Sequence, residues 1–305
     1  MPVQRVDQSL ISVVITAHDE GVEVRRTIDS IRAMSEASYE IILVDDGSTD
    51  GCCEHNGLGN DVRLIRHDRR IGVAFSRYEA SQLAQGQVIA YLDAHQRVEG
   101  DSLERCAELA LAKHAIVCPD VCGLDDEIRI HGAYFVQCHR TNLFSAEWKY
   151  RKPQGEIARL SSLRAPAYLV PRSIYPIVGW SPLLRGWGGS EAAISLKAFF
   201  AGVEILHLCG PLIRHQFKRK FHYDVGWPEV WRNHALTARV CFDERTWYDY
   251  WLPEVFEPCL SDAVQTELES EAIKAEHARF ARVKVRHDRD FWTRLAFRNL
   301  PDVLR

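Results

Sequence analysis

The first 120 residues alternate short apolar runs with amphipathic segments, and this alternation limits the fold more than any other feature of the sequence. The apolar runs lie at residues 11–15, 39–44, 62–65, 88–92 and 115–118. Segments with helical spacing of apolar residues lie at 22–33, 72–84 and 103–112. Strands joined through helices imply right-handed crossovers and a mainly parallel sheet, and continuous apolar strands indicate helices on both faces. The sequence therefore predicts an α/β fold.

The second half of the chain has a less regular pattern. Pro119 follows the fifth apolar run and predicts the end of that strand. The other expected elements are an extended segment at 128–138, a loop at 148–164, a strand at 167–170, a helix at 190–200, a strand at 203–206, a long polar helix at 261–285 and another helix at 289–304. The sheet is thus expected to continue beyond residue 120.

Charge and cysteine content exclude some classes of protein. The net charge is -4, so no basic field favours a nucleic-acid partner. The first ten residues lack a signal pattern and no apolar run has membrane-spanning length, so we expect a cytoplasmic protein. The 9 cysteines argue against a disulfide framework. Cysteines 118, 122 and 138 with His139 match no compact zinc module, so we expect buried thiols there.

The fourth apolar run ends in Asp93-Ala94-His95. Alternate residues of an extended chain lie on the same side, so the carboxylate and the imidazole project together. Both are ligands for divalent transition metals, and open α/β sheets bind ligands at the carboxyl ends of their strands. The spacing permits a metal site. The alternative is that Asp93 caps a turn and His95 is a solvated loop residue.

The ends of the first two strands also favour a nucleotide over a dinucleotide cofactor. The turn after the first strand, residues 16–20, has no glycine-rich phosphate loop, and the chain has no G-x-x-x-x-G-K motif. The second strand ends in Asp45-Asp46-Gly47-Ser48. A carboxylate here can accept hydrogen bonds from a nucleoside, while a metal neutralises its diphosphate. A tight turn with Asx hydrogen bonds is the alternative.

Several stretches occur together in an order and spacing that indicate a family. In the first half they are ISVVITAHDE, EIILVDDGSTD, VRLIRHDRRIG and VIAYLDAHQRV. They resemble the nucleotide-sugar-binding half of GT-A glycosyltransferases of the family 2 type, and more narrowly the polypeptide N-acetylgalactosaminyltransferases, which carry D-x-H where most GT-A enzymes have D-x-D. In the second half, RGWGGSEAAISLKAFFAG resembles the W-G-G-E-N-x-E motif of those transferases, and LIRHQF resembles their V-G-H-V-F segment. The resemblance spans about residues 10–245.

The resemblance implies a GT-A fold and a role for each matching residue. Asp93, His95 and His215 would bind a divalent metal, Mn²⁺ by analogy, although two imidazoles and a carboxylate suit zinc more obviously. The alternative for His215 is a core or surface histidine. The residues implied for the nucleotide sugar are Thr16, Ala17, His18, Glu20, Asp45, Arg70, Asp93 and Ala94. Capping of the following helix is an alternative for Glu20.

The second-half motif departs from the family pattern. Trp187 would lie against the sugar and the acceptor, or else be a core tryptophan at a helix start. Ser190 and Ala193 stand where the family has glutamates, and Glu191 stands at the asparagine. Glu191 occupies the position of the general base in many inverting family 2 enzymes, whereas retaining relatives have no such base. Its alternative is an acid placed by the dipole in the first turn of a helix.

Three functions follow from the resemblance. The first is metal-dependent transfer of a sugar from a UDP-sugar to a peptide or protein side chain. The second is the same chemistry on a polysaccharide, a lipid-linked glycan or a small molecule. The third is non-catalytic binding of a sugar nucleotide, which the changes at residues 190 and 193 motivate. An intact set of metal-ligand residues argues against the third function.

The resemblance also suggests a domain organisation. We expect a catalytic GT-A domain at residues 1–250, with a nucleotide-sugar half at 10–120 and an acceptor half at 121–250, followed by a helical extension at 251–305. The extension interleaves Phe291, Trp292, Leu295 and Phe297 with arginines 286, 289, 294 and 298. Such a basic amphipathic helix is able to touch a membrane surface. We favour packing on the catalytic domain or on a second subunit.

Overall fold

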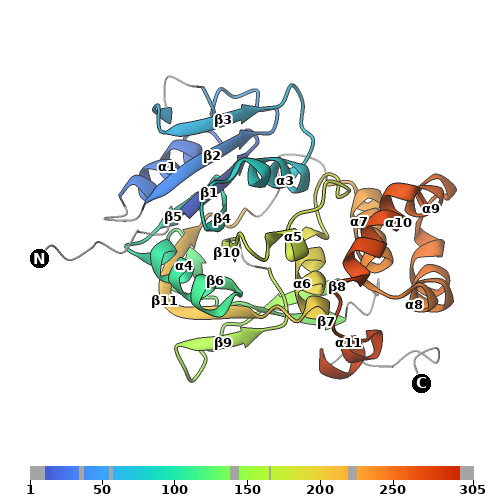
Figure 1. Cartoon of the computed structure of the whole chain (residues 1–305). Helices are drawn as coiled ribbons and strands as arrows, with labels where there is room; N and C mark the ends of the chain where they lie inside the picture. The colour runs from blue at the N-terminus through green and yellow to red at the C-terminus, as the bar shows by residue number, and fades with distance from the viewer. Residues whose placement is uncertain are drawn as a thin grey trace, which may run out of the picture.

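A computed structural model describes residues 11–33, 38–54, 58–137, 144–164, 166–218 and 225–295. Its central sheet has the strand order β3-β2-β1-β4-β10-β6-β11-β5, with β9 paired to β11. Figure 1 shows the N-terminal strands and helices on one side of the molecule and the C-terminal helices α7 to α10 gathered on the other. The predicted α/β class is confirmed.

The N-terminal part of the sheet is parallel, as the sequence predicts. It consists of β1 (Ile11–Ala17), β2 (Tyr39–Asp45), β3 (Val62–Arg66) and β4 (Val88–Asp93). The connecting helices are α1 (Glu23–Arg32) and α3 (Val73–Leu83), and α4 (Ser102–Lys113) follows β4. Alternate residues of β1 enter two different hydrophobic clusters, with Val13 in one and Val14 in the other. The strands are apolar throughout because both faces of the sheet are buried.

Antiparallel strands complete the sheet. Strand β10 (Tyr168–Pro171) lies antiparallel between β4 and β6 (Ile116–Gly123), and β11 (Ile205–His215) runs parallel to β6. The short strand β5 (Gln96–Val98) pairs antiparallel with the end of β11. The mainly parallel sheet expected from the sequence is therefore found, with antiparallel insertions that bring the end of β11 beside the end of β4.

The prediction that Pro119 ends the fifth strand is wrong. Strand β6 continues through Pro119 to Gly123. The pairing of β6 with β11 jumps from Cys118–His207 to Asp120–Leu212, so Pro119 lies where the ladder is interrupted. Proline has no N–H to donate, and a bulge is one of the few places where a sheet accepts it.

Other boundaries also differ from the sequence-based expectation. The expected loop at 148–164 contains strand β9 (Ile157–Leu160), and the extended segment at 128–138 contains β7 (Ala133–Gln137), which pairs with β8 (Phe144–Trp148). The expected long helix at 261–285 is two helices, α9 (Asp262–Leu268) and α10 (Glu271–Ala281). The break occurs because Ser270 adopts an extended conformation and starts a second helix.

The remaining helices build the C-terminal side of the molecule. They are α5 (Tyr175–Val178), α6 (Ser190–Ala201), α7 (Trp227–Cys241), α8 (Glu244–Thr246), the π-helix η1 (Trp247–Phe256), the short 3-10 helix η2 (Glu257–Cys259) and α11 (Asp288–Arg294). No helix in the described part of the chain combines the length and the apolar character needed to cross a membrane.

Aromatic side chains attach the last described helix to the rest of the molecule. In α11, Phe291 is 0 % exposed and Trp292 is 4 % exposed. The Phe291 ring lies 5.2 Å from Phe242 and 5.9 Å from Phe144, centroid to centroid. The apolar residues of this segment therefore pack inward, in keeping with the favoured expectation for it. Phe297 and Arg298, which were part of that expectation, lie outside the described residues, as do Cys138 and His139.

We expect Phe291→Ala to lower the free energy of unfolding by about 3–5 kcal/mol, because it leaves a cavity among packed rings. Urea unfolding followed by circular dichroism measures this loss. Val285→Ala is the control, because Val285 is 68 % exposed and its truncation should change stability by less than about 0.5 kcal/mol. Equal losses in the two variants would show that α11 contributes no packing energy.

Candidate metal and nucleotide-sugar site

The carboxyl ends of β1, β2 and β4 lie side by side. Thr16 on β1 pairs with Asp93 on β4, and Ala17 pairs with Asp45 on β2. On the other side, His215 ends β11 and pairs with Gln96 of β5, directly after His95. The sheet topology therefore brings residues distant in sequence to one edge.

Asp93, His95 and His215 converge at this edge. One donor atom from each lies within 4.8 Å of the others, which is close enough for a shared metal ion. His215 Nε2 lies 3.3 Å from Asp93 Oδ2, and the two imidazole rings are 4.9 Å apart. The geometry thus brings together the three residues that the sequence predicts as metal ligands.

Glu20 contacts the His95 ring, and Lys218 in turn contacts Glu20. Glu20 Oε2 lies 3.0 Å from His95 Nδ1, and Lys218 Nζ donates to both Glu20 oxygens, at 2.7 and 2.6 Å. Burial acts to raise the pKa of Glu20, but His95 and Lys218 outweigh it, and the pKa lies below its usual range. An ionised Glu20 accepting the Nδ1 proton leaves Nε2 of His95 as the ligand atom. The helix-capping alternative for Glu20 is not seen, since α1 has no side-chain cap.

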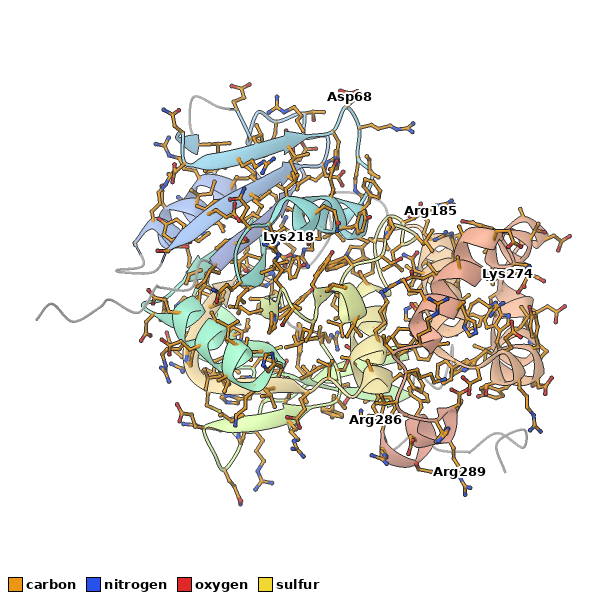
Figure 2. All side chains as sticks on the ribbon, viewed as in Figure 1. Asp68, Arg185, Lys218, Lys274, Arg286 and Arg289 are labelled. Carbon is orange, nitrogen blue, oxygen red and sulfur yellow. The ribbon has the colours of Figure 1, made fainter. Side chains whose placement is uncertain are left out.

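Lys218 is partly buried, with its side chain 20 % exposed. Figure 2 labels it near the centre of the view, and Lys274 and Arg289 farther out. Its ion pair with Glu20 joins the segment after β11 to the turn after β1. The pair therefore ties together the two strand ends that flank the candidate metal site.

Arg77 fixes the orientation of Asp93. This α3 residue is 2 % exposed, and its Nη2 donates to Asp93 Oδ1 at 2.7 Å. Its guanidinium also lies over the Trp180 ring at 5.3 Å. Burial acts to raise the pKa of Asp93, but the hydrogen bond from His215 and the charge of Arg77 hold that pKa well below its usual range. Asp93 is thus ionised, with Oδ1 on Arg77 and Oδ2 toward His215.

The turn after β2 is held closely against the loop before α3. Asp46 accepts backbone hydrogen bonds from Ile71 and Gly72, both at 2.8 Å. Gly47 has φ +72, and a Cβ there would come within 2.6 Å of the Arg70 backbone nitrogen. Only glycine fits this approach without a shift of backbone. The turn therefore lies directly against the backbone of Arg70.

Asp45 ends β2 and His18 directly follows β1, so both lie at the carboxyl edge of the sheet. Asp45 is 1 % exposed, and its oxygens accept from Arg66 Nε and from the Ser48 backbone, both at 2.8 Å. His18 Nδ1 lies 2.9 Å from the Asp46 carbonyl oxygen. Both oxygens of Asp45 thus already have protein partners, and its role toward a nucleoside stays a prediction.

The second-half motif forms a loop that reaches the first half. A Cβ on Gly72 would lie 2.5 Å from Gly186, so the two backbones are in direct contact. Asn233 on α7 donates from Nδ2 to the Arg185 and Gly188 carbonyls, at 2.6 and 2.9 Å, and so fixes the loop. Trp187, at the loop tip, is 36 % exposed and is therefore not a core tryptophan.

Glu191 lies in the first turn of α6, directly after this loop. Burial acts to lower the pKa of Arg77, but the negative charge of Asp93 above all, with a contribution from Glu191, raises it.

Sequence reasoning missed three residues that shape this site: Arg77, Lys218 and Asn233. Arg77 is the one basic residue in a helix whose other buried positions are small, Ala74, Ser76, Ala80 and Ser81, which is a usable signal. Lys218 and Asn233 act through contacts with residues far away in the sequence, and no local pattern marks them.

Comparison with known proteins shows what this arrangement is similar to. Residues 12–158 match the family model described as Glycosyl transferase family 2. Human polypeptide N-acetylgalactosaminyltransferase 14 is 27% identical over 258 residues, which cover 78% of this chain and 47% of the relative. The chain spans about half the length of the curated relatives it matches.

Two solved structures have the same fold. The crystal structure of GalNAc-T7 with UDP, GalNAc and Mn²⁺ superposes with a TM-score of 0.69 at 23% identity, covering 96% of this chain and 57% of that one. Staphylococcus aureus TarS in complex with UDP-GlcNAc gives a TM-score of 0.53 at 12% identity, covering 96% and 95%. The GT-A fold expected from the sequence is confirmed.

Proposed function

We propose, on the premise that residues 12–158 form a Glycosyl transferase family 2 domain, that this chain transfers a sugar from a UDP-sugar to an acceptor with the help of a divalent metal. The observation that carries the proposal is the convergence of Asp93, His95 and His215 at the carboxyl edge of a GT-A sheet. That edge is where open α/β sheets bind their ligands.

The donor set fits a divalent ion. One carboxylate oxygen and two imidazole nitrogens supply three ligands, and the Glu20–His95 contact provides the outer support that metal-binding imidazoles usually have. When bound, the ion neutralises the charge that develops on the departing diphosphate. We assign it as Mn²⁺, which is supported by the Mn²⁺ in the GalNAc-T7 structure.

The chain's own side chains prepare this site. Arg77 keeps Asp93 ionised and aimed, and Glu20 with Lys218 sets the tautomer of His95. We expect Trp187, in the loop at 186–189, to lie against the sugar and the acceptor. Glu191 is expected to face the acceptor group, either as the base or as a positioning carboxylate.

The donor nucleotide is expected to be uridine diphosphate. Asp45 and Thr16 lie at adjacent strand ends, Arg70 lies in the loop between β3 and α3, and both structural relatives named above were solved with UDP or a UDP-sugar. Calorimetry with Mn²⁺ should show UDP binding well ahead of GDP and ADP. Asp45→Asn should weaken UDP binding, whereas the exposed Asp68→Asn, which Figure 2 shows at the periphery, should not. Equal affinity for the three nucleotides would contradict the assignment.

The acceptor we propose is a peptide or protein side chain, and the names of the curated relatives support this. Polysaccharide, lipid-linked or small-molecule acceptors are the second candidate, because the fold is shared by enzymes of different acceptors. Non-catalytic binding is the third, and the intact metal-ligand set argues against it. A cytoplasmic location stays a prediction.

Mass spectrometry separates these functions. Candidate peptides are incubated with UDP-sugars and Mn²⁺, and a peptide mass increased by one sugar supports the proposal. Release of UDP without any modified peptide, in the presence of glycan acceptors, favours the second candidate. Tight UDP binding with neither transfer nor donor hydrolysis indicates a binding protein.

A further inference from the structure

We propose that Asp120, His131, His207 and Cys209 form a second metal site, of the zinc class and structural in role. All four side chains are buried, and one donor atom from each lies within 4.8 Å of the others. None of the four belongs to the candidate site at the sheet edge. The proposal does not rest on the proposed glycosyl transfer.

An irregularity of the sheet assembles this cluster. The register between β6 and β11 jumps after Cys118–His207, so residues 208–211 bulge opposite Pro119. Gly210 takes φ +112 within the bulge and donates its backbone N–H to Asp120 Oδ2 at 3.1 Å. The bulge turns the histidine and the cysteine of an H-x-C pair toward one carboxylate.

The fourth residue comes from a separate segment. Ile130 forms an isolated antiparallel bridge with Val121, which places His131 beside Asp120. His131 Nδ1 and His207 Nε2 lie 2.7 and 2.8 Å from the same oxygen, Asp120 Oδ1. Three segments of the chain thus point nitrogen, oxygen and sulfur donors at one point.

The distances are close to those of a tetrahedral site. With metal–ligand bonds of about 2.0–2.3 Å, donors around zinc lie roughly 3.3–3.8 Å apart. The donors here range from 2.7 Å to at most 4.8 Å apart, so shifts of about 1 Å would reach that geometry. Asp120 Oδ2 has its own partners, Gly210 and Arg129, which leaves Oδ1 for the ion.

Charge and ligand type favour zinc over manganese. An ionised carboxylate and a thiolate balance a divalent cation, and two neutral imidazoles add no charge, so the buried site is neutral when loaded. A thiolate selects zinc or cobalt, whereas oxygen and nitrogen donors alone accept manganese. Four protein ligands leave no open position for a substrate, which is typical of structural sites.

The cluster is accessible to an ion from outside. It lies at a pocket of about 470 Å³ whose lining includes Asp120, His131 and Cys209, together with Lys152 and Glu156. Apart from the cluster, the Cys209 thiol contacts the Gly155 carbonyl oxygen at 3.6 Å. A bound ion would join β6, β11 and the segment at 129–131 at this point.

Cobalt substitution tests the proposal. Protein freed of metal with a chelator is titrated with Co²⁺, and the sulfur-to-cobalt charge-transfer band in the near ultraviolet is recorded. We expect a band that saturates at one equivalent, disappears on addition of Zn²⁺ and is absent from Cys209→Ser. The candidate site at the sheet edge contains no thiol, so the band should persist in the His95→Ala variant.

Matched cysteine variants keep the test specific. Cys122→Ser removes another buried thiol, on the neighbouring strand β6, and Cys52→Ser removes one of two adjacent free thiols, Cys52 and Cys53. Neither residue belongs to the proposed site, so both variants should retain the band. Should Cys209→Ser fail to fold, His207→Gln takes its place, and loss of zinc from the purified protein is measured by elemental mass spectrometry. The proposal is overturned by the absence of a band in the unmodified protein, or by a band that survives in Cys209→Ser.

Discussion

The Asp93→Asn variant is expected to transfer sugar more than about 100-fold more slowly than the unmodified protein, because it removes the negative ligand that holds the metal at the diphosphate. Asparagine keeps an oxygen for the hydrogen bond from buried Arg77, which alanine would leave as an unpaired buried charge. Initial rates of UDP release at saturating Mn²⁺ measure the loss. Asp249→Asn, an exposed aspartate on η1, should retain full activity.

Removal of the metal tests the same expectation without a substitution. EDTA should abolish transfer by the unmodified protein, and Mn²⁺ should restore it. His95→Ala and His215→Ala should lose activity together with Asp93→Asn, because each removes one ligand of a single site. Full transfer in the presence of the chelator would contradict a metal role for all three residues.

Glu191→Gln is the second substitution for which we expect a large effect. If the reaction inverts the anomeric centre, a base must lie about 2.6–3.2 Å from the acceptor group, and its loss should lower kcat by about 100–10,000-fold. UDP affinity should be nearly unchanged, because glutamine keeps the shape of the side chain. If the reaction retains the configuration, the departing phosphate takes the proton, and the loss should be smaller.

The anomeric configuration of the product decides between these two cases. NMR of the product reads it directly, and an α-linked product from a UDP-α-sugar excludes inversion. If the product retains the configuration, we expect Glu191 to position the acceptor. Glu104→Gln is the matched control, because Glu104 also lies in the first turn of a helix, α4. A comparable drop in Glu104→Gln would mean that Glu191 acts through helix stability alone.

The elements that sequence reasoning predicted best are those whose burial is nearly complete. Strands β1, β2 and β4 are buried on both faces, so their apolar runs have no competing explanation. Strand β9 was missed because it has only four residues, none of them fully buried, and it lies within a segment that is otherwise polar. The length of β6 was missed because the bulge that accepts Pro119 is built by the partner strand β11, and nothing in the sequence near Pro119 reveals it.

The candidate site was likewise predictable only in part from the sequence. Asp93 and His95 were found from their own spacing, and His215 from a family resemblance. The contacts that orient them join Glu20 to Lys218 and Arg77 to Asp93, and these depend on tertiary structure. The Asp120 cluster could not be predicted for the same reason, because a bulge in β11 and the bridge between Val121 and Ile130 bring its residues together.

The aromatic packing of α11 has a consequence for how the protein is made. One hydrophobic cluster includes Val14, from the first described strand, and Trp292, from the last described helix. Contacts between such distant parts of a chain slow folding, and a ribosome adds residues from the N-terminus onward. While residue 292 is still inside the ribosome, the growing chain exposes the apolar surface that α11 later covers. During synthesis, this surface is where we expect chaperones to bind and incomplete chains to aggregate.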